Sequence, residues 1–423
     1  MELPVLKDIE QNLSIPDRVL HCFLDGGSHD VNEIAAAVGV SRQTVMKFLQ
    51  FFMRDQLIVV EGKGASGASG GKKPLLYSLS TTLYLLCVTL WNEAFRINLF
   101  NIRGDLIDRI SLYIPLPETA QAAADNIGQL SAMLLEKNGI SLSDVKGVSV
   151  SVPGTVDRKT NMLVYSPPAH FWGPNIPLAE YLQPFFSDST MIFIESPEKI
   201  HTGMYYLEPR YNRTRLVVLA VAHDVVSGCL MENGHILNGT HSLIGELGHM
   251  TVDPDDSEEC ECGSHGCLQK MMSLPRLWRI LRREGPAFPD SPLLAGDGAP
   301  TYREILTAAR DGDGLALLCE DYMVKQLSVL LHNLSVFFDP DYVIFAGKDF
   351  PVSSAFIDKL YSRISSFRFF QNGVKPFEIL FDDVDLIERD ATGSMLTLRW
   401  RLLRSADAYL HLDMEGFIYP TPM

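Results

Sequence analysis

Three cysteines fall within eight residues in the stretch Cys260-Glu261-Cys262-Gly263-Ser264-His265-Gly266-Cys267. The chain has only 7 cysteines in 423 residues, so this clustering is not a result of composition. His249 stands eleven residues before the first of them, in Gly245-Glu246-Leu247-Gly248-His249. Three thiolates and one imidazole complete a tetrahedral zinc shell with no open position, which is the pattern of a structural site. The sequence therefore predicts structural zinc at His249, Cys260, Cys262 and Cys267.

Three other interpretations of this region stay open. His265 lies inside the cluster and is a rival for the fourth ligand position, although the Gly-Glu-x-Gly-His context favours His249. The acidic stretch from Asp253 to Glu261 could be taken for a calcium site, but a solvated loop is the more ordinary interpretation. The Glu246 carboxylate could likewise do no more than accept hydrogen bonds from backbone in a tight turn.

The length and composition indicate a globular protein of two or three domains. Hydrophobic residues make up 46% of the chain and charged residues 21%, and no run approaches the ~18 apolar residues of a membrane helix. The N-terminus lacks the basic-then-apolar order of a signal peptide. Four scattered cysteines (Cys22, Cys87, Cys229, Cys319) have no disulfide-like spacing. These features predict a cytoplasmic location without membrane insertion.

The net charge of −16 argues against a protein that coats nucleic acid with its whole surface. Residues 1–81 hold eight Lys/Arg and nine Asp/Glu, so nearly all of the negative charge lies after them. Residues 41–73 hold six basic residues and two acidic ones. A local basic patch on an acidic protein is typical of a small DNA-binding module attached to a larger body.

The apolar pattern of the first 60 residues predicts three helices. The first runs from Arg18 to Gly26, and the second from Val31 to Val38 after a capping box formed by Asp30 and Glu33. Gly39 permits a tight turn before a third helix capped by Ser41. Two helices joined by a short glycine-containing turn form the helix-turn-helix pattern.

A strand near Leu57–Val60 and another near Leu75–Leu79 then flank a glycine-rich basic loop, which predicts a winged hairpin. The alternative is a three-helix protein-interaction module with a flexible linker. The basic face favours DNA binding, with recognition-helix residues in the major groove and loop lysines near phosphates. The residues predicted to bind DNA are Ser41, Arg42, Gln43, Thr44, Lys47, Lys72 and Lys73.

From Leu83 onward a strand meander is followed by alternating helices and strands, and this scheme partly repeats from Arg215. Two successive units of this kind predict two α/β lobes with a cleft that holds a ligand. We therefore expect domains at 1–81, at 82–200 and at 201–390, with a C-terminal helix at about 391–404 returning to the first lobe.

Several of these motifs resemble the ROK family of repressors and sugar kinases, which has an actin-like ATPase (ribonuclease H-like) fold. The segment Gly70-Gly71-Lys72-Lys73-Pro74 looks like the family's wing end, and Val152-Pro153-Gly154-Thr155-Val156-Asp157 looks like its VPGxVD loop. The Gly245–His249 turn and the three clustered cysteines look like its zinc signature. By this resemblance the zinc ligands are His249 and the clustered cysteines, and Glu246 and His249 flank a sugar pocket. Gln269 stands where the family usually has a sugar-binding glutamate.

The departures from the family pattern predict that ATP binding and phosphoryl transfer are lost. Val88–Ala94 lacks the glycines of the first phosphate loop, and Pro197 stands at the position of the catalytic aspartate. Residues 222–228 and 347–349 depart from the second phosphate loop and the adenosine motif. The missing aspartate is also a sugar contact in the family, and Glu198 lies one position further on.

These observations predict a zinc-containing, non-enzymatic DNA-binding regulator, chiefly a repressor of carbohydrate uptake or metabolism genes. The family resemblance implies a homodimer or tetramer, a palindromic operator, and a sugar or sugar-phosphate effector. One alternative is an active ATP-dependent sugar kinase that has kept a DNA-binding appendage. Another is a regulator controlled by a protein partner and not by a sugar.

Overall fold

The computed structural model describes residues 14–54, 56–64, 73–91, 94–211, 213–222, 225–295, 298–364 and 375–404. The chain forms two compact units. The first unit comprises Met1–Pro153, Lys159–Glu195 and Ala391–Met423, and the second comprises Gly154–Arg158 and Ser196–Asp390. Among the residues described, no helix is both long and apolar enough to cross a membrane.

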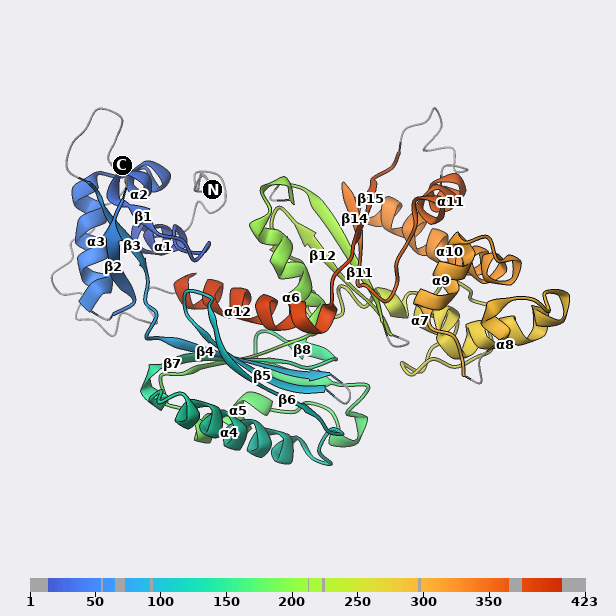
Figure 1. The fold of residues 1–423 in the computed structure, drawn as a ribbon, viewed down its shortest axis with the longest axis horizontal. Coiled ribbons are helices and arrows are strands. Elements are labelled where there is room, and N and C mark those ends of the chain that lie inside the picture. The colour runs from blue at the N-terminus through green and yellow to red at the C-terminus, as the bar shows by residue number, and fades with distance from the viewer. Residues whose placement is uncertain are drawn as a thin grey trace. The chain divides into compact units, whose positions relative to one another are not determined.

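The first unit begins with a small module of three helices and a three-stranded antiparallel sheet in the order β1-β3-β2 (Figure 1). Its elements are α1 (Ile15–His21), β1 (His29–Asp30), α2 (Val31–Val38), α3 (Arg42–Arg54), β2 (Ile58–Lys63) and β3 (Leu75–Leu79). The expected bounds of the first helix, Arg18–Gly26, were wrong. A capping box on Ser14 starts the helix earlier, and turns replace it after His21.

The caps expected for the other two helices are confirmed. The Asp30 side chain accepts hydrogen bonds from the backbone N–H groups of Asn32 and Glu33, and Gly39 ends α2 in the left-handed region at φ 76°. The Ser41 hydroxyl accepts a hydrogen bond from the backbone N–H of Thr44 at 3.1 Å. The apolar stripe of α3 is buried in the module, and it comprises Val45, Phe48, Leu49 and Phe52.

The rest of the first unit is a five-stranded sheet in the order β10-β7-β4-β5-β6. The antiparallel strands β4 (Tyr84–Trp91), β5 (Ala94–Asn101) and β6 (Leu106–Tyr113) are followed by the parallel strands β7 (Val145–Ser151) and β10 (Met191–Glu195). Helices α4 (Ala120–Lys137) and α5 (Leu178–Leu182) cover one face, and α12 (Leu386–Arg404) lies on the other (Figure 1). A Cβ at Gly147 would come within 2.9 Å of Leu398, which shows how closely α12 packs on β7.

The second unit repeats this topology with a second five-stranded sheet, in the order β13-β12-β11-β14-β15. In both sheets an antiparallel three-strand meander is extended by two parallel strands on the side of its first strand. The strands are β11 (Arg215–Ala222), β12 (Val225–Glu232), β13 (His235–Ile236), β14 (Tyr342–Ala346) and β15 (Glu378–Asp382). The partial repeat expected from the sequence is therefore a repeat of sheet topology.

Helices of the second unit surround this sheet and share one apolar core with it. They are α7 (Leu268–Met272), α8 (Leu274–Glu284), α9 (Tyr302–Arg310), α10 (Gly314–Phe337) and α11 (Ser354–Ile364). Helix α6 (Pro197–Gly203) also belongs to this unit. Two short strands, β8 (Thr155–Asp157) and β9 (Met162–Tyr165), follow β7 in the chain. The loop between β13 and α7 carries the cysteine cluster, so this core supports the predicted metal site.

Candidate functional site

The four predicted zinc ligands converge on one point. Their ligand atoms all lie within 4.8 Å of one another. The Sγ atom of Cys260 lies 3.5 Å from Nδ1 of His249, and Sγ of Cys262 lies 3.6 Å from Sγ of Cys267. A zinc ion with bonds of ~2.3 Å to sulfur has tetrahedral ligand–ligand edges of ~3.8 Å. The donors are therefore spaced for one tetrahedral metal ion, and three thiolates with one imidazole suit zinc.

The backbone between the ligands is a tight loop that its glycines permit. The N–H of Cys260 donates to the carbonyl of Ser264, and the N–H of Gly263 donates back to the carbonyl of Cys260, each at 2.8 Å. Gly266 has φ +67°, and a Cβ there would stand 1.8 Å from the carbonyl oxygen of Asp253. Only glycine fits this position, and the close approach brings Cys267 back beside His249.

The acidic stretch before the cluster is held by basic side chains of the following helices. Arg276 on α8 contacts Asp256 at 2.6 Å and Glu258 at 3.1 Å. Burial opposes ionisation of Asp256, but the Arg276 ion pair outweighs it and lowers the pKa of Asp256 below its usual value. Arg279 also pairs with Glu258. These carboxylates therefore fix the cysteine loop to α8, which accounts for them without a calcium ion.

The Gly245–His249 turn packs directly against β12. A Cβ at Gly248 would lie 1.9 Å from the carbonyl oxygen of Val226, and one at Gly245 would lie 2.8 Å from that of Gly228. The short 3-10 helix Leu247–His249 follows Glu246 and carries the first metal ligand. The two glycines thus let one turn hold both Glu246 and His249 close to β12.

Glu246 and Gln269, the other two predicted pocket residues, lie beside the metal cluster. The Thr155 hydroxyl on β8 donates to Oε1 of Glu246 at 3.2 Å. Gln269 follows the last cysteine on α7, and its Oε1 lies 3.3 Å from the place that a Cβ of Gly248 would take. Both Glu246 and Gln269 are half-buried. The structure therefore brings the predicted pocket residues together within the second unit.

Glu198 joins this group from the first turn of α6. Burial, and next the charge of Glu246, raise the pKa of Glu198 to about 7. Carboxyl oxygens in a half-buried site can accept several hydrogen bonds from a ligand rich in hydroxyl groups. Pro197, at the position where the family has its aspartate, is the N1 residue of α6, and its fixed φ suits the first helical turn.

Replacing Glu198 with glutamine should stabilise the protein at pH 8 and leave its stability almost unchanged near pH 4.5. A carboxyl whose pKa is raised in the folded state contributes stability below its unfolded value of ~4.5, and this stability is lost as pH rises through about 7. Above pH 7 the free energy of unfolding of the variant is expected to exceed that of the wild type by an amount on the order of 2 kcal/mol. Urea unfolding of both proteins at pH 4.5, 6 and 8 measures it. An equal difference at all three pH values would contradict the assignment.

The segments compared with the kinase phosphate loops lie in strands where they are described, and the segment compared with the adenosine motif follows β14 as a turn. Val88–Trp91 belongs to β4 and pairs with β5, and the Leu90 side chain is buried. Residues 92–93 and 223–224 lie outside the described residues. The backbone N–H of Gly347 donates a hydrogen bond to the backbone carbonyl of Asp382, and the Lys348 side chain forms an ion pair with Asp385. In these segments, backbone N–H groups and side chains are engaged within the protein.

The predicted DNA-binding residues of α3 share one exposed surface. Ser41, Arg42, Gln43 and Lys47 are exposed, and Thr44 is half-buried beside the Ser41 hydroxyl at 2.8 Å. They lie opposite the stripe that packs into the module. Lys73, before β3, is also exposed, whereas Lys72 lies outside the described residues.

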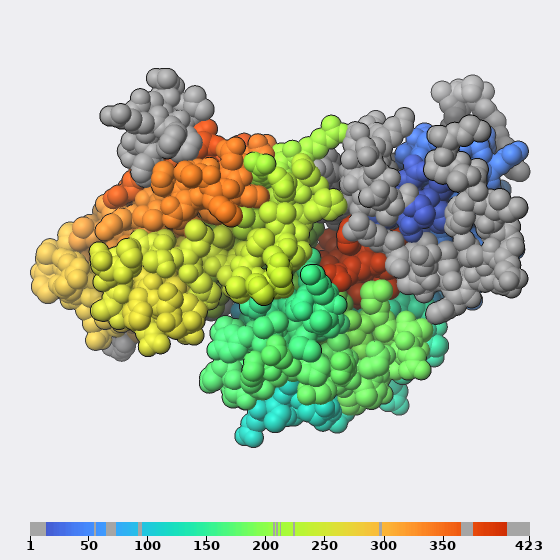
Figure 2. All heavy atoms as spheres, turned by 180° about the vertical axis from the view of Figure 1, so that it is seen from behind, coloured from blue at the N-terminus to red at the C-terminus, as the bar shows by residue number. Residues whose placement is uncertain are grey.

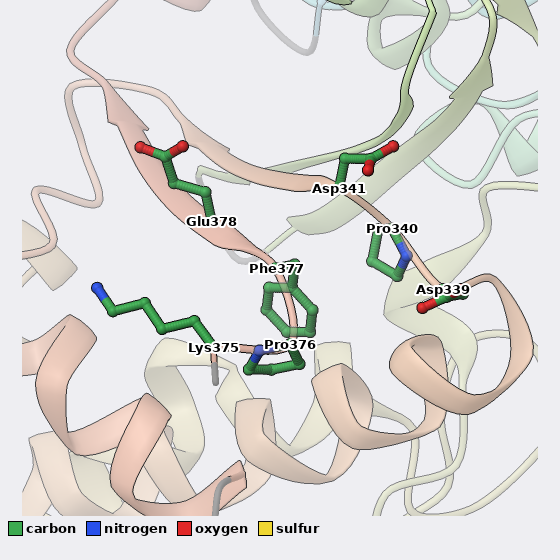
Figure 3. A pocket seen from close by; sticks show the side chains of 7 residues that line it. All are labelled: Asp339, Pro340, Asp341, Lys375, Pro376, Phe377 and Glu378. Atoms are coloured by element: carbon green, nitrogen blue, oxygen red, sulfur yellow. The ribbon is translucent and has the colours of Figure 1, made fainter. Parts of the chain in front are cut away.

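A separate surface pocket of about 470 Å³ lies at the start of β14 and β15 (Figure 3). It is lined by Asp339, Pro340, Asp341, Lys375, Pro376, Phe377 and Glu378. The Asp341 carboxylate accepts a hydrogen bond from the backbone N–H of Arg215 at 2.8 Å, and the Lys375 ammonium lies over the Tyr361 ring. Asp341 and Lys375 are therefore engaged in contacts within the second unit. None of the predicted site residues lines this pocket.

Comparison with known proteins gives both regulators and kinases. The chain is 24% identical over 319 residues to the DNA-binding transcriptional dual regulator NagC of Escherichia coli, covering 75% of this chain and 76% of that one. It is 25% identical over 269 residues to a glucokinase of Thermotoga maritima, covering 63% and 82%. A solved ROK family transcriptional regulator, a homologue of the E. coli MLC protein, superposes with a TM-score of 0.76 at 16% identity. That match covers 93% of this chain and 98% of the other, so it extends to the N-terminal module.

The ROK family model matches residues 85–383, which is more than half of the chain. The matched segment includes both five-stranded sheets, the cysteine loop and the carboxylates beside it. The chain therefore belongs to the ROK family.

Proposed function

We propose that this protein is a DNA-binding transcriptional regulator, a repressor of carbohydrate uptake or metabolism genes, whose ROK body is the effector domain. The observation that carries the proposal is the exposed basic and polar surface at the start of α3, on a module that precedes the ROK segment. The similarity to NagC supports it, and so does the match to a solved ROK regulator, which covers 93% of this chain and so extends beyond the kinase-like body.

The N-terminal module acts as a winged helix-turn-helix domain in this proposal. Helices α2 and α3 are joined by the turn at Gly39, and the β2–β3 hairpin forms the wing. Arg42, Gln43, Thr44 and Lys47 contact bases and phosphates in the major groove. Lys72 and Lys73 contact phosphates from the hairpin. Two such modules in a homodimer would read a palindromic operator.

In this proposal the effector pocket is formed by Glu246, His249 and Gln269. The hydrogen bond from Thr155 to Glu246, and the effect of Glu246 on the pKa of Glu198, support including Thr155 and Glu198. With Nδ1 of His249 directed at the metal cluster, the other ring nitrogen carries a proton and can donate a hydrogen bond to a ligand. The acceptors around it suit the hydroxyl groups of a sugar or sugar phosphate. Ligand binding would alter the balance between conformations with different affinity for DNA.

The metal in this proposal is zinc, held by His249, Cys260, Cys262 and Cys267, and its role is structural. Four protein ligands leave no position for water, so the ion would act by ordering the loop. The ordered loop would place His249 and the neighbouring Glu246 for the effector.

We expect no ATP-dependent sugar phosphorylation, and we expect the Pro197→Asp variant to remain inactive as well. Restoring a carboxylate at the base position does not restore a phosphate loop, because Val88–Trp91 forms part of a paired strand. A coupled assay with glucose, xylose and N-acetylhexosamines measures this, with a ROK glucokinase as the positive control. Turnover of any of these sugars by the wild-type protein would establish the kinase alternative.

Selection of genomic DNA fragments bound by the purified protein, at physiological salt, tests the proposed function directly. A panel of sugars and sugar phosphates is then applied to the enriched fragment. Enrichment followed by sugar-dependent release supports the proposal. Release that needs a protein partner and no sugar would favour the partner-controlled alternative, and no enrichment over competitor DNA would refute DNA-binding regulation.

A further inference from the structure

The hydrophobic core of the N-terminal module continues into the rest of the first unit. One cluster of buried side chains joins α1, α2 and α3 to β4, β5 and β10 and to the C-terminal helix α12. The α12 residues in it are Ala391, Met395, Leu398, Leu402 and Leu403. The ribbon view shows α12, in red, beside the blue module and over the strands of the first sheet (Figure 1), and the space-filling view shows red atoms near the blue ones (Figure 2). The module is therefore packed against its neighbours and is not held by a linker alone.

A buried arginine lies at the centre of this packing. The side chain of Arg399 on α12 is 2% exposed. Its guanidinium donates one hydrogen bond to the carbonyl of Leu24, just after α1, and another, of 2.6 Å, to the carbonyl of Arg103, between β5 and β6. Arg399 thus joins three segments, the N-terminal module, the sheet hairpin and the C-terminal helix, which are far apart in sequence.

The β5–β6 hairpin contacts the N-terminal module directly, next to Arg399. Nε of Arg103 donates to the carbonyl of Gly26 at 3.2 Å, and its guanidinium pairs with Glu61 on β2. A Cβ at Gly26 would lie 2.5 Å from the Arg103 carbonyl oxygen and 3.0 Å from Nη1 of Arg399. Gly26 also has φ +73°, a conformation that glycine adopts readily. The close approach of the two backbones therefore depends on glycine at this position.

The surroundings of Arg399 are those of a specific structural contact. Burial lowers the pKa of Arg399 to about 10, and the charge of Asp25 partly opposes this. The Asp25 carboxylate is in turn held by the Gly27 N–H at 2.8 Å and by His29 at 3.1 Å. A buried guanidinium is tolerated only where hydrogen bonds and opposite charge compensate it, so the geometry of this contact is narrowly defined.

The same helix begins in the unit that holds the proposed effector pocket. Its first residues, Leu386–Asp390, belong to the second unit, and the rest belongs to the first. Arg389 pairs with Asp382 at the end of β15, and its guanidinium lies 4.5 Å from the centre of the Tyr205 ring. Only the part of α12 from Ala391 onward, which carries Arg399, belongs to the first unit together with the N-terminal module.

We propose that Arg399 is the positioning residue for DNA recognition. The proposal rests on the proposed function, because it concerns the same DNA-binding surface. Arg399 touches no DNA. It fixes the orientation of α1–α3 against the first sheet, and so determines the fraction of molecules in which α3 is correctly placed.

The test compares the full-length wild type with Arg399→Met, Arg399→Lys and Arg401→Met. The control residue Arg401 is on the same helix, and its guanidinium lies over the Phe193 ring of β10. Two quantities are measured: the Kd for the fragment enriched by the wild type, and the distance distribution between spin labels carried by unnatural amino acids. The labels replace Gln50 on α3 and Met133 on α4, which are both exposed and lie in the same unit.

Arg399→Met should broaden the distance distribution and raise Kd by about tenfold or more, since Kd rises as the competent fraction falls. Arg399→Lys, which can donate to one of the two carbonyl groups, should rescue part of both changes. Arg401→Met should stay within about twofold of the wild type. Zinc content and near-UV circular dichroism check that each variant is folded. If Arg399→Met does not fold, the comparison of Arg399→Lys with Arg401→Met carries the test.

A narrow, unchanged distribution with unchanged Kd in the folded Arg399 variants would overturn the proposal. A rise in Kd with an unchanged distribution would also overturn it, because the effect would then not arise from positioning. Failure of the proposed function looks different: the wild type itself would enrich no DNA. In that case the distance distributions still decide whether Arg399 fixes the module.

Discussion

Replacing both Arg42 and Lys47 with alanine is expected to weaken binding to the enriched DNA fragment by about 10²- to 10³-fold at physiological salt. Both side chains are exposed at the start of α3, opposite the buried stripe, so their removal leaves the module's core intact. An arginine contact to a base is worth ~1–3 kcal/mol, and a phosphate contact adds a salt-dependent contribution. Fluorescence anisotropy at several salt concentrations measures both the affinity and its salt dependence.

Arg54→Ala is the matched control, because Arg54 is exposed at the opposite end of the same helix. It should change Kd by less than about threefold, as expected for a charge remote from the bases. If the double variant binds as tightly as the wild type, or if the control loses as much affinity, the assignment of α3 as the recognition helix is wrong.

Replacing Cys267 with alanine is expected to abolish stoichiometric zinc binding and to lower the thermal unfolding midpoint by ~10 °C or more. The purified wild type should carry one zinc per chain. Removing one of four ligands opens the tetrahedral shell, and the loop held between β13 and α7 then loses its cross-link. Elemental analysis and differential scanning calorimetry measure the two effects. A chelator added to the wild type should reproduce the change.

Cys319→Ala is the control for this experiment. Cys319 is a fully buried thiol on α10 outside the metal cluster, so the substitution removes the same atoms from an apolar environment. It should keep full zinc content and cost no more than a small core truncation, ~1 kcal/mol. Full zinc content in the Cys267 variant would show that the four residues are not the metal site.

Much of the fold could be read from local patterns. The capping boxes, the apolar stripe of α3 and the strands of both meanders depend on residues close together in the sequence. Other elements were not predicted. Helix α6 begins at Pro197, in a segment that was discussed only because it departs from a kinase motif, and helix α8 was not predicted at all. The first helix was misplaced because Ser14 and Asp17 form a capping box that the apolar pattern does not reveal.

The metal cluster was the part of the site most open to prediction. Thiol and imidazole ligands of a structural site lie close together in sequence, since the loop that carries them must fold around one ion. The proposed pocket was harder to predict from the sequence, because its residues come from four separate segments: β8, α6, the Glu246 turn and α7. The sequence motif containing Thr155 was noted, but no role was assigned to that residue. The effect of the Glu246 charge on the pKa of Glu198 became evident only in the folded chain.

The sequence by itself determined the type of many local elements and the predicted chemistry of the cysteine cluster, because helix caps, strand patterns and metal-ligand spacing act over a few residues. Only the tertiary structure decided which distant groups meet. It brought Glu198 within the electrostatic influence of Glu246, the acidic loop into contact with Arg276, and Arg399 into contact with the carbonyl groups of Leu24 and Arg103. Such contacts depend on burial and on the packing of whole sheets and helices, which no short segment encodes.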